Sequence, residues 1–158
     1  MSTLEQACAE FIAPLEVSPD TPVPLTAYQD IAGVWTIGYG HTGPDVHEGL
    51  TWTIGDALAA LADDVAPVLA AVVGWNARHP WGRGQVVAMV SLAYNIGLGG
   101  FHGSSVLRYH NAGDFRAAAD SFLLWDKAHI DGTLRVVPGL LNRRHIERRE
   151  YLAGVVVP

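Results

Sequence analysis

Alternation of apolar and polar residues predicts a helix at the start of the chain, followed by a loop. From Thr3 to Leu15 the apolar positions follow the three-four spacing of one buried helical face, and Ser2 or Thr3 is suited to cap its start. Pro14 is expected to kink or end this helix. Residues 17–24 contain several prolines and small polar residues, which indicates a loop.

The segment from Leu25 to His41 is typical of two or three short antiparallel strands. It is rich in aromatic and β-branched residues, and the glycines Gly33, Gly38 and Gly40 punctuate it at turn positions. A second loop is expected over 42–51, before the helical part of the chain begins.

The remaining pattern predicts helices over about 53–73, 85–96, 104–111, 114–125 and 138–152. Pro67 is expected to bend or split the first of these, and 97–100 is expected to be a loop that ends the second. The stretch 85–96 is apolar on nearly every side, which is typical of a helix buried all round. A small sheet lobe, a linking helix and a helical lobe together predict an α+β fold.

Composition and charge narrow the class of protein. With 158 residues, 49% of them hydrophobic, the chain suits one domain or two small lobes. No apolar run reaches the roughly 18 residues that a membrane span needs, and residues 1–15 contain no basic residue of the kind that opens a secretory signal. We therefore expect neither a membrane span nor export by a signal peptide. Cys8, the single cysteine, is expected to be a small buried hydrophobe.

Charge is distributed unevenly along the chain. Residues 1–77 contain ten acidic residues and no Lys or Arg, whereas residues 78–158 contain all ten basic residues and six acidic ones. One interpretation is an ordinary solvated surface; the other is two lobes of opposite sign that face each other across a cleft. Nucleic-acid binding is disfavoured, because the acidic half repels phosphates and no continuous basic stripe is visible.

The most informative stretch for chemistry runs from Asp30 to His41. A turn at Ala32-Gly33 folds the chain back, so that Asp30 and Thr36 approach each other across a hairpin. An acid and a hydroxyl on neighbouring strands are able to position a water molecule, as a hydrolase requires. Taken alone, such a pair also fits any exposed hairpin. Two histidines, His41 and His47, among scattered acids do not make a zinc pattern, so no metal is expected.

Residues 27–30 (AYQD) and 33–42 (GVWTIGYGHT) resemble the active-site hairpin of phage-type lysozymes, glycoside hydrolase family 24. Further blocks at 85–97 and 139–144 are similar to the buried central helix and the closing helix of that family, and the resemblance spans about residues 10–154. It implies a single lysozyme-like domain over 1–158, with a small antiparallel sheet lobe (about 17–52) and a larger helical lobe (about 75–158 plus the N-terminal helix) joined by a long helix.

The resemblance implies an endolysin, a muramidase that hydrolyses the β-1,4 bond between N-acetylmuramic acid and N-acetylglucosamine in peptidoglycan and so lyses the cell wall. It implies a monomer that needs no cofactor or metal, binds glycan strands, does not bind nucleic acid and does not insert stably into a membrane. The expected location is the host cytoplasm until release to the periplasm. The alternatives are a catalytically impaired wall-binding or virion-associated protein of the same fold, and a chitinase-like enzyme.

The family's catalytic set is a Glu at the end of the first helix, followed by an Asp and a Thr on the hairpin. Asp30 and Thr36 match the last two at the expected spacing. The usual spacing places the first at Thr21, which is not an acid. Glu16 closes the first helix as the family's acid does, and is favoured if the following loop carries an insertion; Asp20, one residue from the usual spacing, is the alternative.

Further roles follow from the resemblance or from the local pattern. Arg143 matches the position from which the family's helical lobe presents an Arg to the catalytic Glu; the competing interpretation is a solvated Arg paired with Glu147. Asn95 is expected to contact a sugar, and His41 to be hydrogen-bonded after the hairpin. Three arginines are expected on a solvated helix face: Arg144, Arg148 and Arg149. Three aromatic residues alternate along the strands as core candidates, one of which could stack on a sugar: Tyr28, Trp35 and Tyr39.

Overall fold

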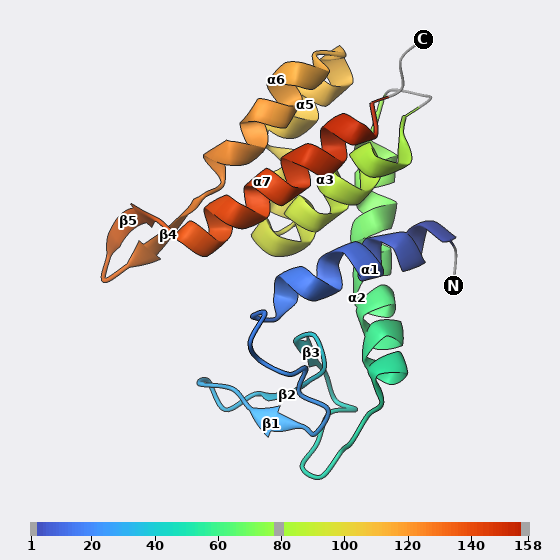
Figure 1. Ribbon diagram of the computed structural model, residues 1–158, viewed down its shortest axis with the longest axis vertical. Helices are drawn as coiled ribbons and strands as arrows, with labels where there is room; N and C mark the ends of the chain where they lie inside the picture. The colour runs from blue at the N-terminus through green and yellow to red at the C-terminus, as the bar shows by residue number, and fades with distance from the viewer. Residues whose placement is uncertain (1–2, 78–80, 156–158) are drawn as a thin grey trace. The chain divides into compact units, whose positions relative to one another are not determined.

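The computed structural model describes residues 3–77 and 81–155. Its helices are α1 (Thr3–Glu16), α2 (Ile54–Trp75), α3 (Arg83–Ile96), α4 (Leu98–His102), α5 (Ser105–Ala112), α6 (Phe115–Ser121), the 3-10 helix η1 (Phe122–Leu124) and α7 (Pro138–Ala153) (Figure 1). Its strands are β1 (Tyr28–Gln29), β2 (Trp35–Ile37), β3 (His41–Thr42), β4 (Lys127–Ile130) and β5 (Thr133–Val136). The predicted α+β class is confirmed.

The chain divides into two compact units, Met1–Pro67 and Val68–Pro158. The first unit holds α1, the three-stranded sheet and the start of α2, and the second holds the other helices and the β4–β5 hairpin. This division groups α1 with the sheet, whereas the sequence suggested that α1 belongs with the helical lobe. The lobe boundaries expected from the sequence remain a prediction.

Helix α1 buries the apolar face that its sequence pattern predicts. Cys8 and Ile12 are fully buried and Ala9 is nearly so, which confirms Cys8 as a small buried hydrophobe. Pro14 lies in the last turn without ending the helix, which continues to Glu16. This is possible because an exposed proline near a helix end removes a single backbone hydrogen bond from the ladder. The predicted cap at Ser2 lies outside the described residues.

The three strands of the first unit form an antiparallel sheet in the order β1-β2-β3. Tyr28 pairs with Thr36 in the first ladder, and Ile37 pairs with His41 in the second. Beneath the sheet lies a small core of Ala27, Ile37 and Val46, against which Trp35, Leu50 and Trp52 pack.

Helix α2 begins with a reciprocal cap between Thr53 and Asp56. The Asp56 carboxylate accepts from the backbone N–H of Thr53 (2.8 Å), while the backbone N–H of Asp56 donates to Thr53 Oγ1 (3.1 Å). Pro67 lies inside α2 and does not split it. By length and composition α2 is long and apolar enough to cross a membrane, so the expectation that no segment reaches this size was wrong. Core helices of water-soluble proteins meet the same criterion.

In the second unit α7 runs alongside α3 and also packs against α6 and η1 (Figure 1). Helix α3 is buried continuously from Gly84 to Ala93, which confirms the helix buried all round. The crossing with α7 is close because glycines meet there. A Cβ atom on Gly84 would lie 2.6 Å from the backbone oxygen of Glu150 and 3.0 Å from Cα of Gly154.

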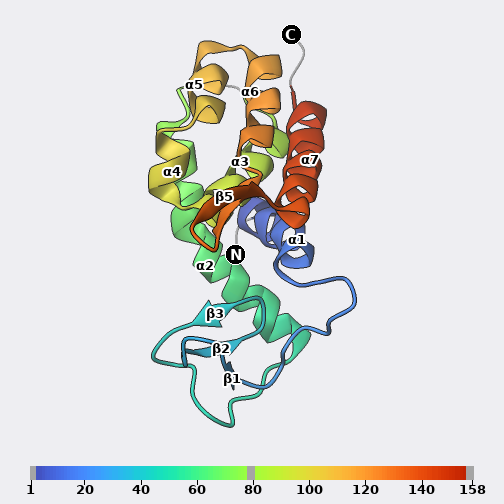
Figure 2. The same cartoon turned by 90° about the vertical axis from the view of Figure 1, so that its left-hand side faces the viewer.

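Two features of the second unit differ from the sequence-based expectation. Leu98–His102 forms the short helix α4, although a loop was expected there, because Phe101 is fully buried and draws this turn onto the core. The predicted helix over 114–125 ends as α6 and η1, and the chain then forms the β4–β5 hairpin (Figure 2). This hairpin turns at Asp131 and Gly132, both with positive φ, which is the backbone that a two-residue Asp-Gly turn requires.

Candidate active site

The local sequence determines the type of turn that joins β1 to β2. The carbonyl of Asp30 accepts from the backbone N–H of Gly33 (2.9 Å), and the N–H of Asp30 donates to the Val34 carbonyl (3.0 Å). Gly33 has a φ of 78°, the left-handed conformation that closes a three-residue hairpin loop. The pairing therefore continues beyond the strands, with Asp30 opposite Val34.

The Asp30 carboxylate also fastens this turn. Its Oδ1 accepts from the backbone N–H groups of Ala32 (2.8 Å) and Val34 (2.9 Å). This is the local bond by which an aspartate at the first position of a turn replaces a backbone partner. Oδ2 accepts no hydrogen bond from any residue in 3–77 or 81–155. One oxygen thus holds the carboxylate in place, and the other is available to a bound molecule.

Thr36 is linked to Asp30 through the backbone of Val34. Its Oγ1 donates to the Val34 carbonyl (3.0 Å), the same oxygen that accepts from the Asp30 N–H. Thr36 pairs with Tyr28, and Asp30 lies two residues after Tyr28, so Asp30 and Thr36 lie on the same face of the hairpin. Because its proton is engaged, the Thr36 hydroxyl oxygen is left as an acceptor. The structure therefore brings these two predicted residues together.

The two candidate acids lie in different surroundings within the first unit. Glu16 is the last residue of α1 and is partly buried. Asp20 lies four residues further along in the loop, in a turn closed by the Thr21 N–H and the Ser18 carbonyl (3.0 Å), and is exposed, as is Thr21. Of the two acids, Glu16 is therefore the one that lies in regular secondary structure and is partly shielded from solvent.

His41 is held by carboxylates on both ring nitrogens. Nδ1 lies 2.8 Å from Asp64 Oδ2 and Nε2 lies 3.2 Å from Asp45 Oδ2, while the ring packs at 5.4 Å from that of Trp52. Burial lowers the pKa of His41, but the hydrogen bonds and negative charges of Asp64 and Asp45 outweigh it and raise the pKa above the ordinary 6.5. This arrangement ties the end of the hairpin to α2.

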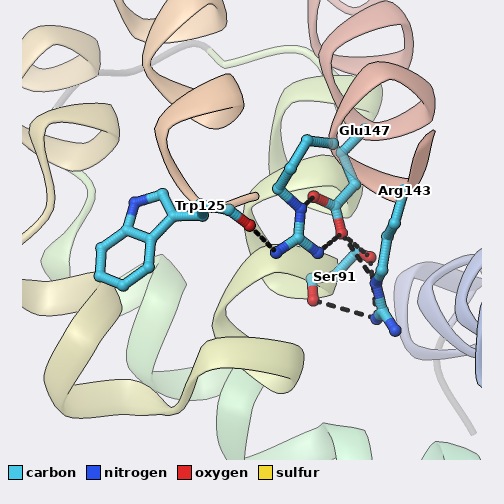
Figure 3. Close-up of polar contacts among 5 residues, drawn as sticks. Ser91, Trp125, Arg143 and Glu147 are labelled. Atoms are coloured by element: carbon cyan, nitrogen blue, oxygen red, sulfur yellow. Dashed lines mark hydrogen bonds and ion pairs between the residues drawn. The ribbon is translucent and has the colours of Figure 1, made fainter. Parts of the chain in front are cut away.

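In the second unit Arg143 belongs to a buried charge cluster that joins α7 to α3 (Figure 3). Its Nε donates to Glu147 Oε1 (3.1 Å), and its Nη2 lies 3.4 Å from both the carbonyl and the hydroxyl of Ser91. The Ser91 hydroxyl also donates to Glu147 Oε1, at 2.7 Å. The Arg143–Glu147 pair expected at four-residue spacing is confirmed, but it is buried and not solvated.

Arg144 corrects the sequence-based interpretation of this helix. It was expected on a solvated face and is instead fully buried. Its Nη2 donates to Glu147 Oε1 (2.9 Å), its Nε forms an ion pair with Glu147 Oε2 (2.7 Å), and its Nη1 donates to the Trp125 carbonyl (3.4 Å). Arg149 is exposed as expected, and Arg148 pairs with Asp120 at 2.7 Å.

Glu147 is the centre of this cluster and is fully buried. Burial raises the pKa of the Glu147 carboxyl, while the charges of Arg144 and Arg143 and the Ser91 hydrogen bond oppose the rise. Sequence reasoning treated Glu147 only as a surface partner and missed Ser91. The available signal was Ser91 itself, a polar residue inside a helix that is otherwise apolar on nearly every side.

Comparison with known proteins decides the family. A family model described as phage lysozyme matches residues 22–147. The endolysin of Salmonella phage P22 is 41% identical over 133 residues, covering 82% of this chain and 87% of that protein. The endolysin of Acyrthosiphon pisum secondary endosymbiont phage 1 is 39% identical over 124 residues, covering 78% of this chain and 84% of that protein.

This chain belongs to the phage lysozyme family.

Solved structures agree with this assignment. The muramidase domain of SpmX from Asticaccaulis excentricus superposes with a TM-score of 0.82 at 34% identity, covering 96% of this chain and 99% of that chain. A crystal structure of a P22 lysozyme mutant gives a TM-score of 0.75 at 36% identity, covering 96% and 97%. The lysozyme-like fold expected from the sequence is therefore confirmed, and the chain is an enzyme of the lysozyme class, a peptidoglycan hydrolase.

The range matched by the family model includes some of the candidate site residues and leaves out others. Asp30, Thr36 and Arg143 lie inside the matched range 22–147, whereas Glu16 precedes it. Asn95 is an exposed residue near the end of α3. Within residues 3–77 and 81–155, no three His, Cys, Asp or Glu side chains gather as a metal site would require.

Proposed function

We propose that this lysozyme hydrolyses the β-1,4 bond between N-acetylmuramic acid and N-acetylglucosamine in bacterial peptidoglycan and thereby lyses the cell wall. The observation that supports this reaction is the link between Asp30 and Thr36 through the backbone of Val34. A carboxylate and a hydroxyl held at a fixed spacing on one face are suited to orient a water molecule against a sugar carbon.

Each catalytic group has a distinct task in this proposal. A glycosidic oxygen leaves readily only if it is protonated as the bond breaks, so one carboxyl must supply a proton. We assign that role to Glu16; its partly buried position at the end of α1 supports this choice over the exposed Asp20. Asp30 stabilises the oxocarbenium-like transition state or activates the attacking water, and Thr36 holds that water through its hydroxyl.

Other residues assist in ways that rest on the family resemblance. We propose that Arg143 has the orienting role that the resemblance gives to its position and that Asn95 contacts a sugar. The buried Glu147 and Ser91 hold the Arg143 guanidinium in one orientation, as an orienting role requires. His41 supports the hairpin through Asp64 and Asp45.

The proposed setting is phage lysis. The enzyme is made in the host cytoplasm, is released to the periplasm, and acts there as a monomer on glycan strands, without nucleic acid or stable membrane insertion. No cofactor is needed, because the carboxyl and hydroxyl groups supply the whole of the acid–base chemistry.

The test is turbidity loss of permeabilised Gram-negative cells, followed by mass spectrometry of the released fragments. Wild type should lyse the cells, and Glu16→Gln should lower the rate roughly 10²- to 10⁴-fold because it removes the proton donor. Asp20→Asn and Glu10→Gln are matched controls, exposed acids in the loop and on α1, and should remain within about 2-fold of wild type.

Each contrary outcome has a defined meaning. Lysis that survives in Glu16→Gln and is lost in Asp20→Asn assigns the acid to Asp20. A wild-type protein that sediments with sacculi and releases no fragments is the impaired wall-binding protein. Cleavage of chitin oligomers in preference to peptidoglycan points to a chitinase-like enzyme. Fragments that end in an anhydro sugar instead of a reducing sugar would show that the enzyme catalyses an internal transfer and not hydrolysis.

A further inference from the structure

Apolar side chains gather on the hairpin face that carries Asp30 and Thr36. Tyr28 pairs with Thr36, and Asp30 lies opposite Val34, so alternation places all four side chains on one face. The opposite face is the core side, where Ile37 and Ala27 are buried. The outer face of a small antiparallel sheet is usually polar. Here it alternates aromatic, acidic, aliphatic and hydroxyl groups.

Two of these side chains are exposed, although burial would stabilise them. Tyr28 is 43% exposed and Val34 is 45% exposed, and Ile31 at the tip of the turn is 110% exposed. Apolar area left in water contributes nothing to the folding free energy. An exposed apolar patch that is continuous with a candidate active site is typical of a surface that covers a ligand.

We infer that Tyr28 is a substrate-binding residue, whose ring stacks on the apolar C–H face of a sugar ring in the glycan strand, with Val34 extending the contact beside Asp30. This inference rests on the proposed function. It adds a binding residue and names the class of group that it contacts, a pyranose ring next to the bond that is cleaved.

The backbone that carries the Tyr28 ring is held in place before substrate binds. The backbone of Tyr28 is fixed by its pairing with Thr36, and the adjoining turn is held by the hydrogen bonds of Asp30 to Gly33, Ala32 and Val34. A platform that is already ordered loses little conformational entropy on binding. The backbone of Tyr28 is also held at a constant distance from those of Asp30 and Thr36, because all three belong to one hairpin.

Charge favours a saccharide over the other partners of an exposed apolar face. Residues 1–77 contain no Lys or Arg, and Asp30 lies on the face itself, so anionic lipid headgroups and nucleic acid are repelled. A sugar ring presents C–H groups to Tyr28 while its hydroxyl and amide groups reach Asp30 and Thr36. The alternation of apolar and polar side chains matches the two-sided character of that ligand.

The test compares Tyr28→Ala, Tyr28→Phe and the control Ile54→Ala in steady-state cleavage of solubilised peptidoglycan. Ile54 is a similarly exposed apolar residue at the start of α2, away from the hairpin. Loss of one stacking contact should raise KM roughly 5- to 20-fold in Tyr28→Ala, with kcat within about 3-fold of wild type. Tyr28→Phe keeps the ring and should remain within about 2-fold of wild type, as should Ile54→Ala.

Binding is measured separately by co-sedimentation with intact sacculi, using Glu16→Gln so that the substrate survives. Adding Tyr28→Ala to this variant should raise Kd by the same factor as KM, while the melting temperature confirms folding. An unchanged Kd and KM in Tyr28→Ala overturns the inference, as does an equal loss in Ile54→Ala. A loss in Tyr28→Phe equal to that in Tyr28→Ala assigns the effect to the hydroxyl and also overturns it. If wild type releases no fragments, the proposed function fails, and the sedimentation comparison still decides the role of Tyr28.

Discussion

Asp30 Oδ1 lies 2.9 Å from the backbone nitrogen of Val34, so the carboxylate proposed to act on substrate also clamps the turn that presents it. The two oxygens divide these tasks, because Oδ1 accepts both turn hydrogen bonds and Oδ2 accepts none from the described residues. A substitution at Asp30 is therefore able to affect stability and activity separately.

Asp30→Asn and Asp30→Ala should separate the two roles. The Asn side-chain oxygen still accepts from the Ala32 and Val34 N–H groups, so the melting temperature should stay within about 2 °C of wild type while kcat falls roughly 10²-fold or more. Asp30→Ala also loses both hydrogen bonds, at about 1–2 kcal/mol, which lowers the melting temperature by a further 2–8 °C or so. Calorimetry and a cleavage assay give both values. Equal stability of the two variants would contradict the clamp.

Glu147→Gln should destabilise the protein strongly. It removes the negative charge with which Arg143 and Arg144 form their buried ion pairs on this helix, and breaking a buried ion pair from one side costs about 3–5 kcal/mol. Urea unfolding measures this loss. Arg149→Gln, an exposed residue on the same helix, is the control and should stay within about 0.5 kcal/mol of wild type. Comparable effects of the two substitutions would show that the cluster contributes little.

Gly84→Ala should weaken the crossing of α3 and α7. The added Cβ would lie 2.6 Å from the backbone oxygen of Glu150, which cannot move without displacing α7, so we expect a loss of about 1–3 kcal/mol. Gly74→Ala is the matched control, since the added Cβ meets nothing within 4 Å and the residue lies in the last turn of α2. Alanine should there stabilise by up to about 1 kcal/mol. Thermal unfolding should therefore show a lower melting temperature for Gly84→Ala and an equal or higher one for Gly74→Ala.

The His41–Asp64 pair should make stability depend on pH. The folded pKa of His41 is raised above 6.5, so protonated His41 stabilises the fold fully below about pH 6.5, and this contribution is lost as the pH rises through the raised value. The melting temperature of Asp64→Asn should therefore fall furthest below that of wild type near pH 5.5 to 6, and the gap should narrow above pH 8 or so. NMR titration of His41 should show a lower pKa in Asp64→Asn. If the difference in melting temperature between wild type and Asp64→Asn instead grew with pH, protonated His41 would not be the stabilising form.

Much of the fold could be predicted from the local sequence pattern. Helix α1 follows from three-four spacing, α3 from an apolar stretch of helical length, and the turn at Gly33 from the need for a positive φ. These features depend on residues within a few positions of one another, so the printed sequence contains their cause.

Long-range packing decided the rest. Nothing local distinguishes the buried Arg144 from the exposed Arg149 on α7, because burial depends on other segments of the chain, such as the one whose Trp125 carbonyl accepts from Arg144. The β4–β5 hairpin was missed because its strands alternate weakly and both faces are largely exposed.

For this protein, sequence alone determined the family resemblance and the pair Asp30 and Thr36, since a hairpin turn fixes their spacing through neighbouring residues. Tertiary structure alone decided that Glu147 is a buried ion and that Tyr28, among three candidate aromatic residues, is the exposed one. The physical reason is that hydrophobic periodicity and turn residues act between neighbours in the chain, whereas burial depends on which distant segment packs against a residue.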